Sequence, residues 1–418
     1  MDAPTLLPLC FLMLFIYSDF PSITMSTFNI PEISENVFYV GARDRDRRLF
    51  DALVTLPQGT TYNSYLIKDE KTAMIDTVNP GFQQELEQKI NQIASVDQLD
   101  YIVMNHAEPD HAMAIPYLLE RNNKAKLVVS KRGADAAKIY FTVPEERLQV
   151  VSDGDTISLG SKTLHFIEAP MLHWPETMFT YLEENKVLFT CDFFGLHTAY
   201  GFYDDEVPNA IEYAKRYFGE IMMPYKGMGK RAMEKIKDLP IDMIAPSHGP
   251  IYRNPDRILK EYWKWTEGET REKVTLVYVS MWRSTEKLIQ QIAATLEKAG
   301  VETSIYNLTA ADVGEIAKDL VDSRGIVLGT PTVLRSMHPL AVYAAHLVNV
   351  LKPPAKYGVI LTSYGWNKGA LTHAAEVLGP TGLEVVGTME INGPPSDEDY
   401  DTLRGIGNAL AEKIKGES

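Results

Sequence analysis

The sequence contains very little cysteine. Its 418 residues include two, Cys10 and Cys191, too few for the disulfide framework that stabilises small secreted domains. No Cys-x-x-Cys pair is present, so the chain offers no thiolate set for iron, zinc or a cluster. Cys191 ends an apolar run, and we expect it to be a buried packing residue rather than a functional thiol.

Positive charge is also scarce. Lys and Arg number 41 against 56 Asp and Glu, which gives a formal net charge of −15. A surface of this sign repels polyanions, so we expect neither nucleic acid nor an anionic membrane as a partner. The hydrophobic fraction of 45% and the charged fraction of 23% are ordinary globular values and exclude disordered and fibrous classes. The length predicts two or three domains.

Long hydrophobic runs are missing too. The apolar stretch 6–17 is shorter than the ~20 residues of a membrane-spanning helix. No Lys or Arg precedes it and Asp2 is acidic, so it lacks the positive region of a signal peptide. We interpret residues 1–24 as an upstream extension or a misplaced start before Met25, with a signal peptide as the alternative. The protein is then expected in the cytoplasm.

Two patterns of secondary structure divide the rest of the chain. Short apolar runs separated by turn residues predict strands over 36–41, 52–57, 62–67, 72–76, 126–130, 148–151, 163–168, 178–182 and 186–190. Helical periodicity appears over 82–94 and 113–121, and the stretch 210–239 is rich in helix. Such a mixture predicts an αββα sandwich, the first domain, over residues 25–270.

After Lys273 strands and helices alternate. Apolar strands are predicted over 274–280, 303–308, 325–329, 357–363 and 383–389, with helices at 285–298, 340–351, 369–378 and 397–415. Strict alternation predicts a doubly wound parallel sheet of flavodoxin type over residues 271–418. Ligands in such a sheet bind beyond the carboxyl ends of the strands.

Four side chains that can bind metal lie within six residues of the first domain. His106, Glu108, Asp110 and His111 follow the apolar stretch 101–104. Imidazole and carboxylate together suit divalent first-row metals. A solvated turn is the alternative, because these residue types favour loops.

Three further polar residues close strand-like runs in the same domain. His173, Asp192 and His248 each follow or end an apolar run and precede a turn. Strand ends that carry His or Asp are typical of a site assembled at one edge of a sandwich. We therefore expect a metal site at that edge.

The second domain carries candidate ligand loops at three strand ends. Hydroxyl and amide groups at a helix N-terminus bind phosphate, although Ser and Thr there can also be simple helix caps. The first loop comprises Ser280, Met281, Trp282, Arg283, Ser284 and Thr285. The other two loops comprise Thr330, Pro331, Thr332, Ser363, Tyr364, Gly365 and Trp366.

The motif His-x-Glu-x-Asp-His, followed by single His, Asp and His positions, resembles the metallo-β-lactamase superfamily and in particular the flavodiiron proteins. The resemblance covers the chain from Met25 onward, with both domains in the same order. Hydrolytic members usually have His where this chain has Glu108. A carboxylate in place of an imidazole makes the ligand set harder, and a harder set favours iron over zinc. The resemblance therefore points to redox chemistry rather than hydrolysis.

The resemblance implies a role for each motif residue. His106, Glu108 and His173 would bind one iron, Asp110 and His248 a second, and Asp192 would bridge them. His111 matches a position whose ligation varies within the family and is included as a ligand. His165 and His197 receive no ligand role.

The resemblance also implies that the three loops of the second domain bind FMN, with Trp282 and Trp366 near the ring. Two features depart from the family pattern. Arg283 occupies a position that is commonly small, and Val333-Leu334-Arg335 replaces a continuation that often contains Asn. Arg283 could add a phosphate contact.

The activity implied is reduction of O2 to water, of NO to nitrous oxide, or both, in a head-to-tail homodimer or dimer of dimers. The electron donor would be rubredoxin, its reductase or a reduced deazaflavin. Tyr200 either supplies a hydrogen bond near the metals or, as we prefer, is a packed strand residue. The alternatives are a zinc hydrolase with a fused flavodoxin-like module and an FMN electron carrier without gas reduction.

Overall fold

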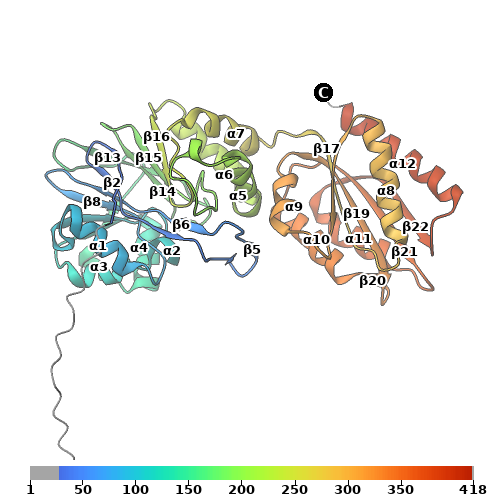
Figure 1. Cartoon of the computed structure of the whole chain (residues 1–418), viewed down its shortest axis with the longest axis horizontal. Helices are drawn as coiled ribbons and strands as arrows, with labels where there is room; N and C mark the ends of the chain where they lie inside the picture. Colours follow the sequence, from blue (N-terminus) through green and yellow to red (C-terminus); the bar gives the residue numbers. More distant parts are fainter. Residues whose placement is uncertain (1–27, 417–418) are drawn as a thin grey trace, which may run out of the picture.

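The computed structural model describes residues 28–416. The expectations for residues 1–24, for Met25 and for Cys10 therefore lie outside the described residues. Two lobes follow one another along the chain (Figure 1), the first blue to yellow and the second orange to red. Within the described residues, no helix is both long enough and apolar enough to cross a membrane.

Two sheets face each other in the first lobe. The larger has the strand order β1 (Glu32–Ser34), β2 (Val37–Tyr39), β7 (Tyr65–Ile67), β8 (Thr72–Ile75), β9 (Leu99–Val103), β10 (Lys126–Ser130) and β11 (Leu148–Val151). The other has the order β12 (Thr156–Ser158), β13 (Thr163–Glu168), β14 (Met178–Leu182), β15 (Val187–Cys191) and β16 (Met243–Pro246). Their inner faces share one apolar core, in which Ile75 and Val103 meet Phe166 and Phe189.

Helices cover both outer faces of this sandwich. The larger sheet packs against α1 (Gln83–Ile93), α3 (Ile115–Arg121) and α4 (Lys131–Phe141), and the smaller sheet against α5 (Ala210–Tyr217), α6 (Lys226–Ile236) and α7 (Pro255–Glu267). The predicted αββα arrangement is therefore confirmed. The helix α4 was not predicted, although Ser130 caps it by accepting a hydrogen bond from the Gly133 amide.

Two predicted strands differ from those in the structure. The run 62–67 breaks into β6 (Thr60–Tyr62) and β7, because β6 pairs with β3 (Ala42–Asp44) outside the two main sheets. The run 52–57 supplies only β5 (Val54–Thr55), which pairs with β4 (Leu49–Phe50) in a separate hairpin. Asp51 and Ala52 at its tip have positive φ angles, as a tight turn requires.

The second lobe is a parallel sheet with helices on both faces, as predicted. The strand order is β18 (Glu302–Asn307), β17 (Arg271–Tyr278), β19 (Ser323–Val333), β21 (Tyr357–Tyr364) and β22 (Glu384–Asn392), with a short β20 (Ser336–Met337) beside β19. One face packs against α8 (Ser284–Lys298) and α12 (Asp397–Lys415), and the other against α9 (Val313–Leu320), α10 (Pro339–Leu351) and α11 (Ala370–Leu378). The order reverses between β17 and β19, which marks the ligand crevice at their carboxyl ends.

The two lobes share a continuous apolar core. The π-helix Phe218–Met222, which follows α5, packs against α9 of the second lobe. At this contact a Cβ on Gly219 would lie 2.4 Å from the carbonyl oxygen of Ala317. The ammonium of Lys215 also lies 2.5 Å from Asp322 across the boundary, and both side chains are buried. Close backbone approach and buried charge pairing fix the lobes relative to each other.

The Gly219 contact yields a test of this interface. Gly219→Ala forces Cβ against backbone atoms that have no side-chain freedom, and overpacking of this kind destabilises by about 1–3 kcal/mol. We expect a lower Tm in calorimetry. The control is Gly227→Ala in α6, where nothing lies within 4 Å of the added Cβ and where Ala should stabilise by about 0.4–1 kcal/mol. Equal Tm values for the two variants would contradict the close approach.

Candidate metal centre

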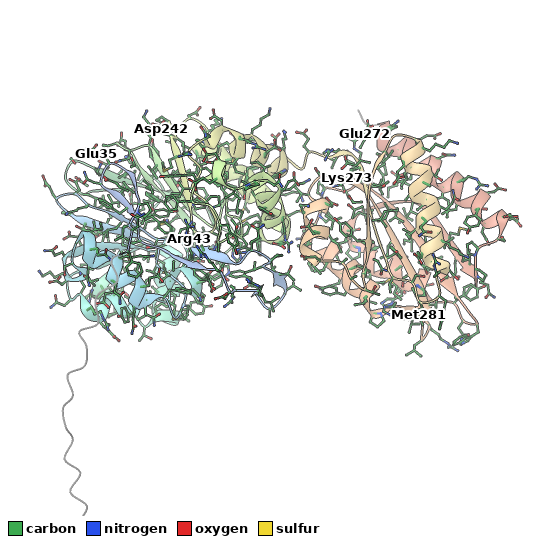
Figure 2. The ribbon with its side chains drawn as sticks, in the orientation of Figure 1. Glu35, Arg43, Asp242, Glu272, Lys273 and Met281 are labelled. Carbon is green, nitrogen blue, oxygen red and sulfur yellow. The ribbon has the colours of Figure 1, made fainter. Side chains whose placement is uncertain are left out.

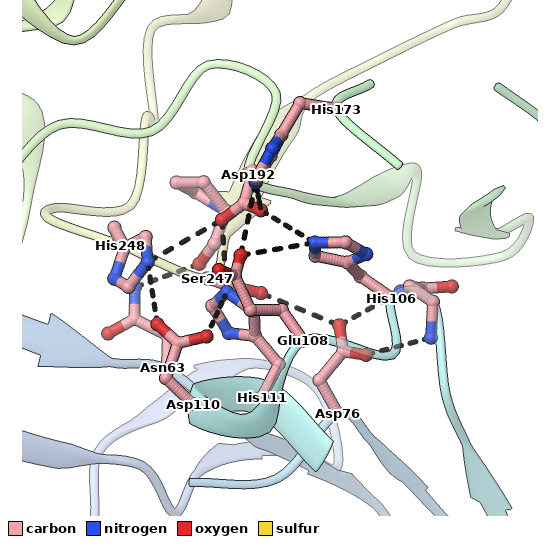
Figure 3. Close-up of polar contacts among 12 residues, drawn as sticks. Asn63, Asp76, His106, Glu108, Asp110, His111, His173, Asp192, Ser247 and His248 are labelled. Atoms are coloured by element: carbon pink, nitrogen blue, oxygen red, sulfur yellow. Dashed lines mark hydrogen bonds and ion pairs between the residues drawn. The ribbon is translucent and has the colours of Figure 1, made fainter. Parts of the chain in front are cut away.

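The predicted metal ligands come from one edge of the sandwich. Glu108 precedes the short helix α2 (Pro109–Ala112), so Asp110 and His111 lie on the first turn of a helix and not in a loop. Pro109 suits the first helical position because its missing N–H would be unpaired there anyway. His173 lies in the connection between β13 and β14, and Asp192 and His248 follow β15 and β16. Figure 3 shows that these side chains point toward one another.

One group of side chains surrounds the Oδ2 atom of Asp192. The Nε2 atoms of His106 and His173 lie 3.3 Å and 3.4 Å from it. Glu108 belongs to the same group, because its Oε2 lies 3.3 Å from Nε2 of His106 and 3.0 Å from Nε2 of His173. Four ligand atoms therefore converge within 4.8 Å of one another.

A second group surrounds the other oxygen of the same carboxylate. Nε2 of His111 lies 3.0 Å from Oδ1 of Asp192, and Nε2 of His248 lies 3.5 Å from it. Asp110 completes the group with Oδ1 at 3.3 Å from His111 and Oδ2 at 3.2 Å from His248. Asp192 thus lies between two separate sets of ligand atoms, and the sequence-predicted residues, including His111, are all brought together.

Several buried ligand atoms of the cluster make no hydrogen bond among the described residues. Both carboxylate oxygens of Asp110 and Asp192, both ring nitrogens of His111 and Nε2 of His248 have no hydrogen-bond partner in the described part of the chain. A buried polar atom without a partner costs about 1–3 kcal/mol, and more where it is charged. Three carboxylates and four imidazoles in one buried volume are the donors that divalent first-row metals prefer. The residues therefore fit two metal ions.

The same crowding determines the proton affinities of the cluster. Burial disfavours a charged His106, but hydrogen bonds to Glu108 and Glu176 outweigh burial and raise its pKa to about 10. Burial likewise opposes the charge on His111, and the nearby carboxylates of Asp110 and Asp192 raise its pKa to about 9. Strong negative potential at the centre favours any bound positive charge. Metal cations supply that charge.

Several residues that hold the ligands were missed in the sequence. Glu176 accepts a hydrogen bond from Nδ1 of His106 at 2.8 Å and another from the amide of Ala107. Asp76, at the end of β8, accepts bonds from the backbone and side-chain amides of Asn105. The signals were present, because Glu176 follows His173 by three residues and Asp76 closes an apolar run in the same way as Asp192.

The remaining expectations for this region have mixed outcomes. Cys191 is buried, as predicted, and burial raises the pKa of its thiol well above the ordinary value. Tyr200 is 56% exposed and lies in an irregular segment, so its interpretation as a packed strand residue is wrong. His165 pairs with Glu183 on the surface, away from the centre. His197 lies closer, with its ring centroid 4.8 Å from that of His248.

The β4–β5 hairpin covers one side of the cluster. The ring of Phe50 lies 5.8 Å from the ring of His248 and 5.0 Å from that of His197. Leu49 and Leu53 on the same hairpin expose close to half of their surface. The hairpin therefore presents an apolar surface beside the metal centre.

The predicted flavin loops converge at the carboxyl ends of β17, β19 and β21. The hydroxyls of Thr285 and Ser363, from two different loops, lie 2.9 Å apart. The Ser280 hydroxyl is buried and finds no hydrogen-bond partner among residues 28–416, as expected of a group placed for a phosphate oxygen. A cavity of about 260 Å³ adjoins these loops, lined by Thr332, Gly365 and Trp366 together with the unpredicted Leu334, Arg335 and Asn367. These residues fit a phosphate-bearing planar cofactor.

The two departures from the family pattern lie at this crevice. Arg283 has a positive φ and its guanidinium pairs with Glu286 at 3.1 Å, so in this structure its charge is directed to a carboxylate. Leu334 and Arg335 also have positive φ angles. Leu334, Trp282 and Trp366 are 96%, 87% and 88% exposed, which gives the crevice an apolar rim.

Replacing Glu176 tests how the ligands are held. Glu176→Gln removes the anionic acceptor from Nδ1 of His106, and loss of such a partner lowers metal affinity by about 10- to 100-fold. Fe(II) titration in a competition assay measures this. Glu183→Gln is the control, because Glu183 also pairs with a histidine at 2.7 Å but far from the cluster. Equal affinity in both variants would contradict the role of Glu176.

Comparison with known proteins agrees with this geometry. Residues 60–249 match the family described as ODP family beta lactamase. A nitric oxide reductase of Moorella thermoacetica is 35% identical over 391 residues, which cover 91% of this chain and 98% of that protein. Rubredoxin oxygen:oxidoreductase from Desulfovibrio gigas has a TM-score of 0.90 at 30% identity, covering 93% and 99% of the two chains. The flavodiiron protein from Giardia intestinalis has a TM-score of 0.89 at 28% identity, covering 93% and 98%. The chain belongs to the flavodiiron protein family.

Proposed function

We propose that this protein reduces O2 to water, NO to nitrous oxide, or both, at a two-iron centre that receives electrons from FMN. The observation that carries the proposal is the position of Asp192, whose two carboxylate oxygens face separate ligand groups. A mononuclear hydrolytic site needs one such group. Two groups that share one carboxylate suit a pair of ions that act on one small molecule.

We assign His106, Glu108 and His173 to one iron, Asp110, His111 and His248 to the other, and Asp192 to both. The convergence of their ligand atoms supports this assignment. His248 donates its Nδ1 proton to the carbonyl of Thr61 at 2.6 Å, which leaves Nε2 free to bind metal. Glu176 holds His106 in the same way, because it accepts a hydrogen bond from Nδ1 of His106 and leaves Nε2 free to bind metal. We also propose that the metal-binding domain spans residues 25–270 and the FMN-binding domain residues 271–418.

The bound groups supply the electron chemistry: FMN transfers electrons one or two at a time, and ferrous ions bind and reduce small diatomic molecules. The balanced reactions are O2 + 4 e⁻ + 4 H⁺ → 2 H2O and 2 NO + 2 e⁻ + 2 H⁺ → N2O + H2O. The protein contributes a sheltered pocket, since His106, His111 and His248 are fully buried.

We assign the phosphate of FMN to the loop Ser280–Thr285 and its ring to the loops at Thr330–Thr332 and Ser363–Trp366. The unpaired Ser280 hydroxyl and the helix that begins at Ser284 support the first assignment. The exposed rings of Trp282 and Trp366 support the second. Aromatic groups beside a flavin set its potential by stacking.

Electron transfer from FMN to iron calls for two subunits. Figure 2 shows Met281, in the proposed phosphate loop, on the lower edge of the second lobe and well away from the first. The apolar rim of this crevice and the apolar hairpin beside the metal centre lie on different lobes. Exposed apolar patches mark interaction surfaces. We therefore infer a head-to-tail homodimer, alone or paired into a dimer of dimers, in which the flavin of one subunit faces the metals of its partner.

We propose a separate electron donor, because these 418 residues contain no Cys-x-x-Cys pair for an iron site. Rubredoxin, a rubredoxin reductase or a reduced deazaflavin would each serve. The cytoplasm, where such reduced carriers are kept, is the proposed location.

Metal analysis combined with gas consumption tests the function. We expect about two irons and one FMN per chain and anaerobic consumption of O2 or NO with a reduced donor. Asp192→Asn should lower turnover by more than about 100-fold with FMN retained, because it weakens both ligand groups at once. His165→Asn, on the surface, should leave both properties unchanged. Zinc with ester or lactam turnover would identify a hydrolase, and FMN reduction without gas consumption would identify an electron carrier.

The dimer is tested at the β4–β5 hairpin. Leu53→Asp introduces a charge on the apolar surface beside the metals and should convert the dimer to monomers in sedimentation or light scattering. Reduction of FMN by the donor should persist, while transfer from FMN to iron should slow. Val385→Asp is the control, since Val385 is similarly exposed, at 46% against 44%, but lies near the amino end of β22. A fully active monomer would contradict the proposed arrangement.

A further inference from the structure

The proposed reactions consume protons at a centre whose ligand group of Asp110, His111 and His248 is buried, while the side chains of Glu108 and His173 are 13% and 14% exposed. His106, His111, His248 and Asp192 expose almost no surface, and Phe50 covers the cluster on the hairpin side. Each electron added to a buried centre is stabilised by a proton that follows it, because uncompensated charge in a low-dielectric interior is costly. A route for protons from solvent is therefore required.

A cavity of about 140 Å³ lies at the boundary between the two lobes. Its walls come from the segment that follows β5, from α5 and the π-helix, and from α9 of the second lobe. Every lining side chain except that of Pro57 carries a polar atom. A cavity needs only about 10–15 Å³ for one water molecule when polar partners are present, so this one has room for several.

The inner end of the cavity adjoins the metal ligands. His197 lines it, and the ring of His197 contacts that of His248. Nδ1 of His197 lies 2.9 Å from the Thr60 hydroxyl, which lies 3.3 Å from Nδ1 of His248. Nε2 of His197 is buried and has no hydrogen-bond partner within the described chain. A water molecule in the cavity would satisfy it.

The outer end of the cavity reaches solvent. Glu315 on α9 has 39% of its side chain exposed, and Thr55 is exposed, whereas the side chain of Glu220 is 4% exposed. Glu220 is thus a buried carboxyl that lines the same cavity as the exposed Glu315 and the buried His197. Gln58 and Tyr213 form one wall, with the Gln58 amide donating to the Tyr213 hydroxyl at 2.6 Å.

We propose that this cavity holds a chain of water molecules that carries protons to the metal centre, and that the Glu220 carboxyl passes them from the rim into the cavity. The inference rests on the proposed gas reduction, which creates the demand for protons. The polar side chains that line it, among them those of His197, Gln58 and Glu220, can hydrogen-bond a chain of water molecules.

The charges around Glu220 suit the role. The largest effect on the Glu220 carboxyl is burial, which disfavours its charged form. The guanidinium of Arg216, 3.0 Å away, favours the charged form, whereas Glu315 on α9 and Asp312, which caps α9, disfavour it. The balance raises the pKa of Glu220 to about 7. A carboxyl with a pKa near the working pH exchanges protons efficiently in both directions.

Infrared difference spectroscopy tests the proposal without relying on turnover. Iron-loaded wild-type protein should show a protonated carboxyl band that titrates near neutral pH, and Glu220→Gln should abolish it. Glu212→Gln, on the exposed face of α5, is the matched control and should retain the band. A band that persists in Glu220→Gln would overturn the assignment to Glu220.

Kinetics supply the second readout. Glu220→Gln should slow gas reduction by about tenfold or more and enlarge the solvent deuterium isotope effect, with iron content, Tm and the rate of FMN reduction unchanged. Glu220→Asp should restore part of the rate, which a purely structural role would not predict. Wild-type turnover in both variants would overturn the proposed role of Glu220 in proton transfer, whereas the proposed gas reduction would stand. Wild-type protein that consumes no gas would instead refute the proposed function, and the infrared result would still decide the carboxyl assignment.

Discussion

The structure depends on one buried carboxylate. Asp192 lies between four imidazoles and two further carboxylates in a volume with almost no exposure. Without cations, carboxylates packed this closely repel one another and leave buried atoms unpaired. Cations bound there would neutralise the cluster, and each oxygen of Asp192 faces a separate ligand group that could hold one. The strand ends of β15 and β16 and the first turn of α2 place the ligands, Glu176 and Thr61 orient His106 and His248, and Asp76 holds Asn105 beside His106.

The fixed relation of the two lobes has a direct consequence for electron flow. A shared apolar core, the backbone contact at Gly219 and the buried Lys215–Asp322 pair hold the lobes in one orientation. The flavin crevice lies at the carboxyl ends of the second sheet, a location set by the strand order and not by the neighbouring lobe. A rigid pair of lobes does not bring its own flavin over its own metals by bending. In the dimer that we propose, association between chains would perform what intramolecular motion does in hinged enzymes.

Much of this could be predicted from sequence because the signals were local. Alternation of strand and helix identified the second sheet, and polar residues that close apolar runs identified side chains that the structure brings together, among them Asp192 and His248. The residues that orient the ligands, Glu176 and Asp76, were missed because their role depends on contacts with residues that are 29 to 70 positions away. Tyr200 was expected on a strand, yet the chain after Asp192 turns to bring His197 toward His248. Tertiary contacts of this kind leave no periodic pattern.

Electrons and protons, both of which the proposed reaction needs, would arrive at the metals from different sides. The hairpin that carries Phe50 and Leu53 faces the proposed partner flavin, whereas the cavity with Glu220 and His197 opens between the lobes. Thr55 belongs to both features, since it ends β5 and accepts a hydrogen bond from Arg216, which also pairs with Glu220. Separate routes would let electrons and protons reach the cluster without sharing a path. The boundary between the lobes therefore has a chemical role as well as a structural one.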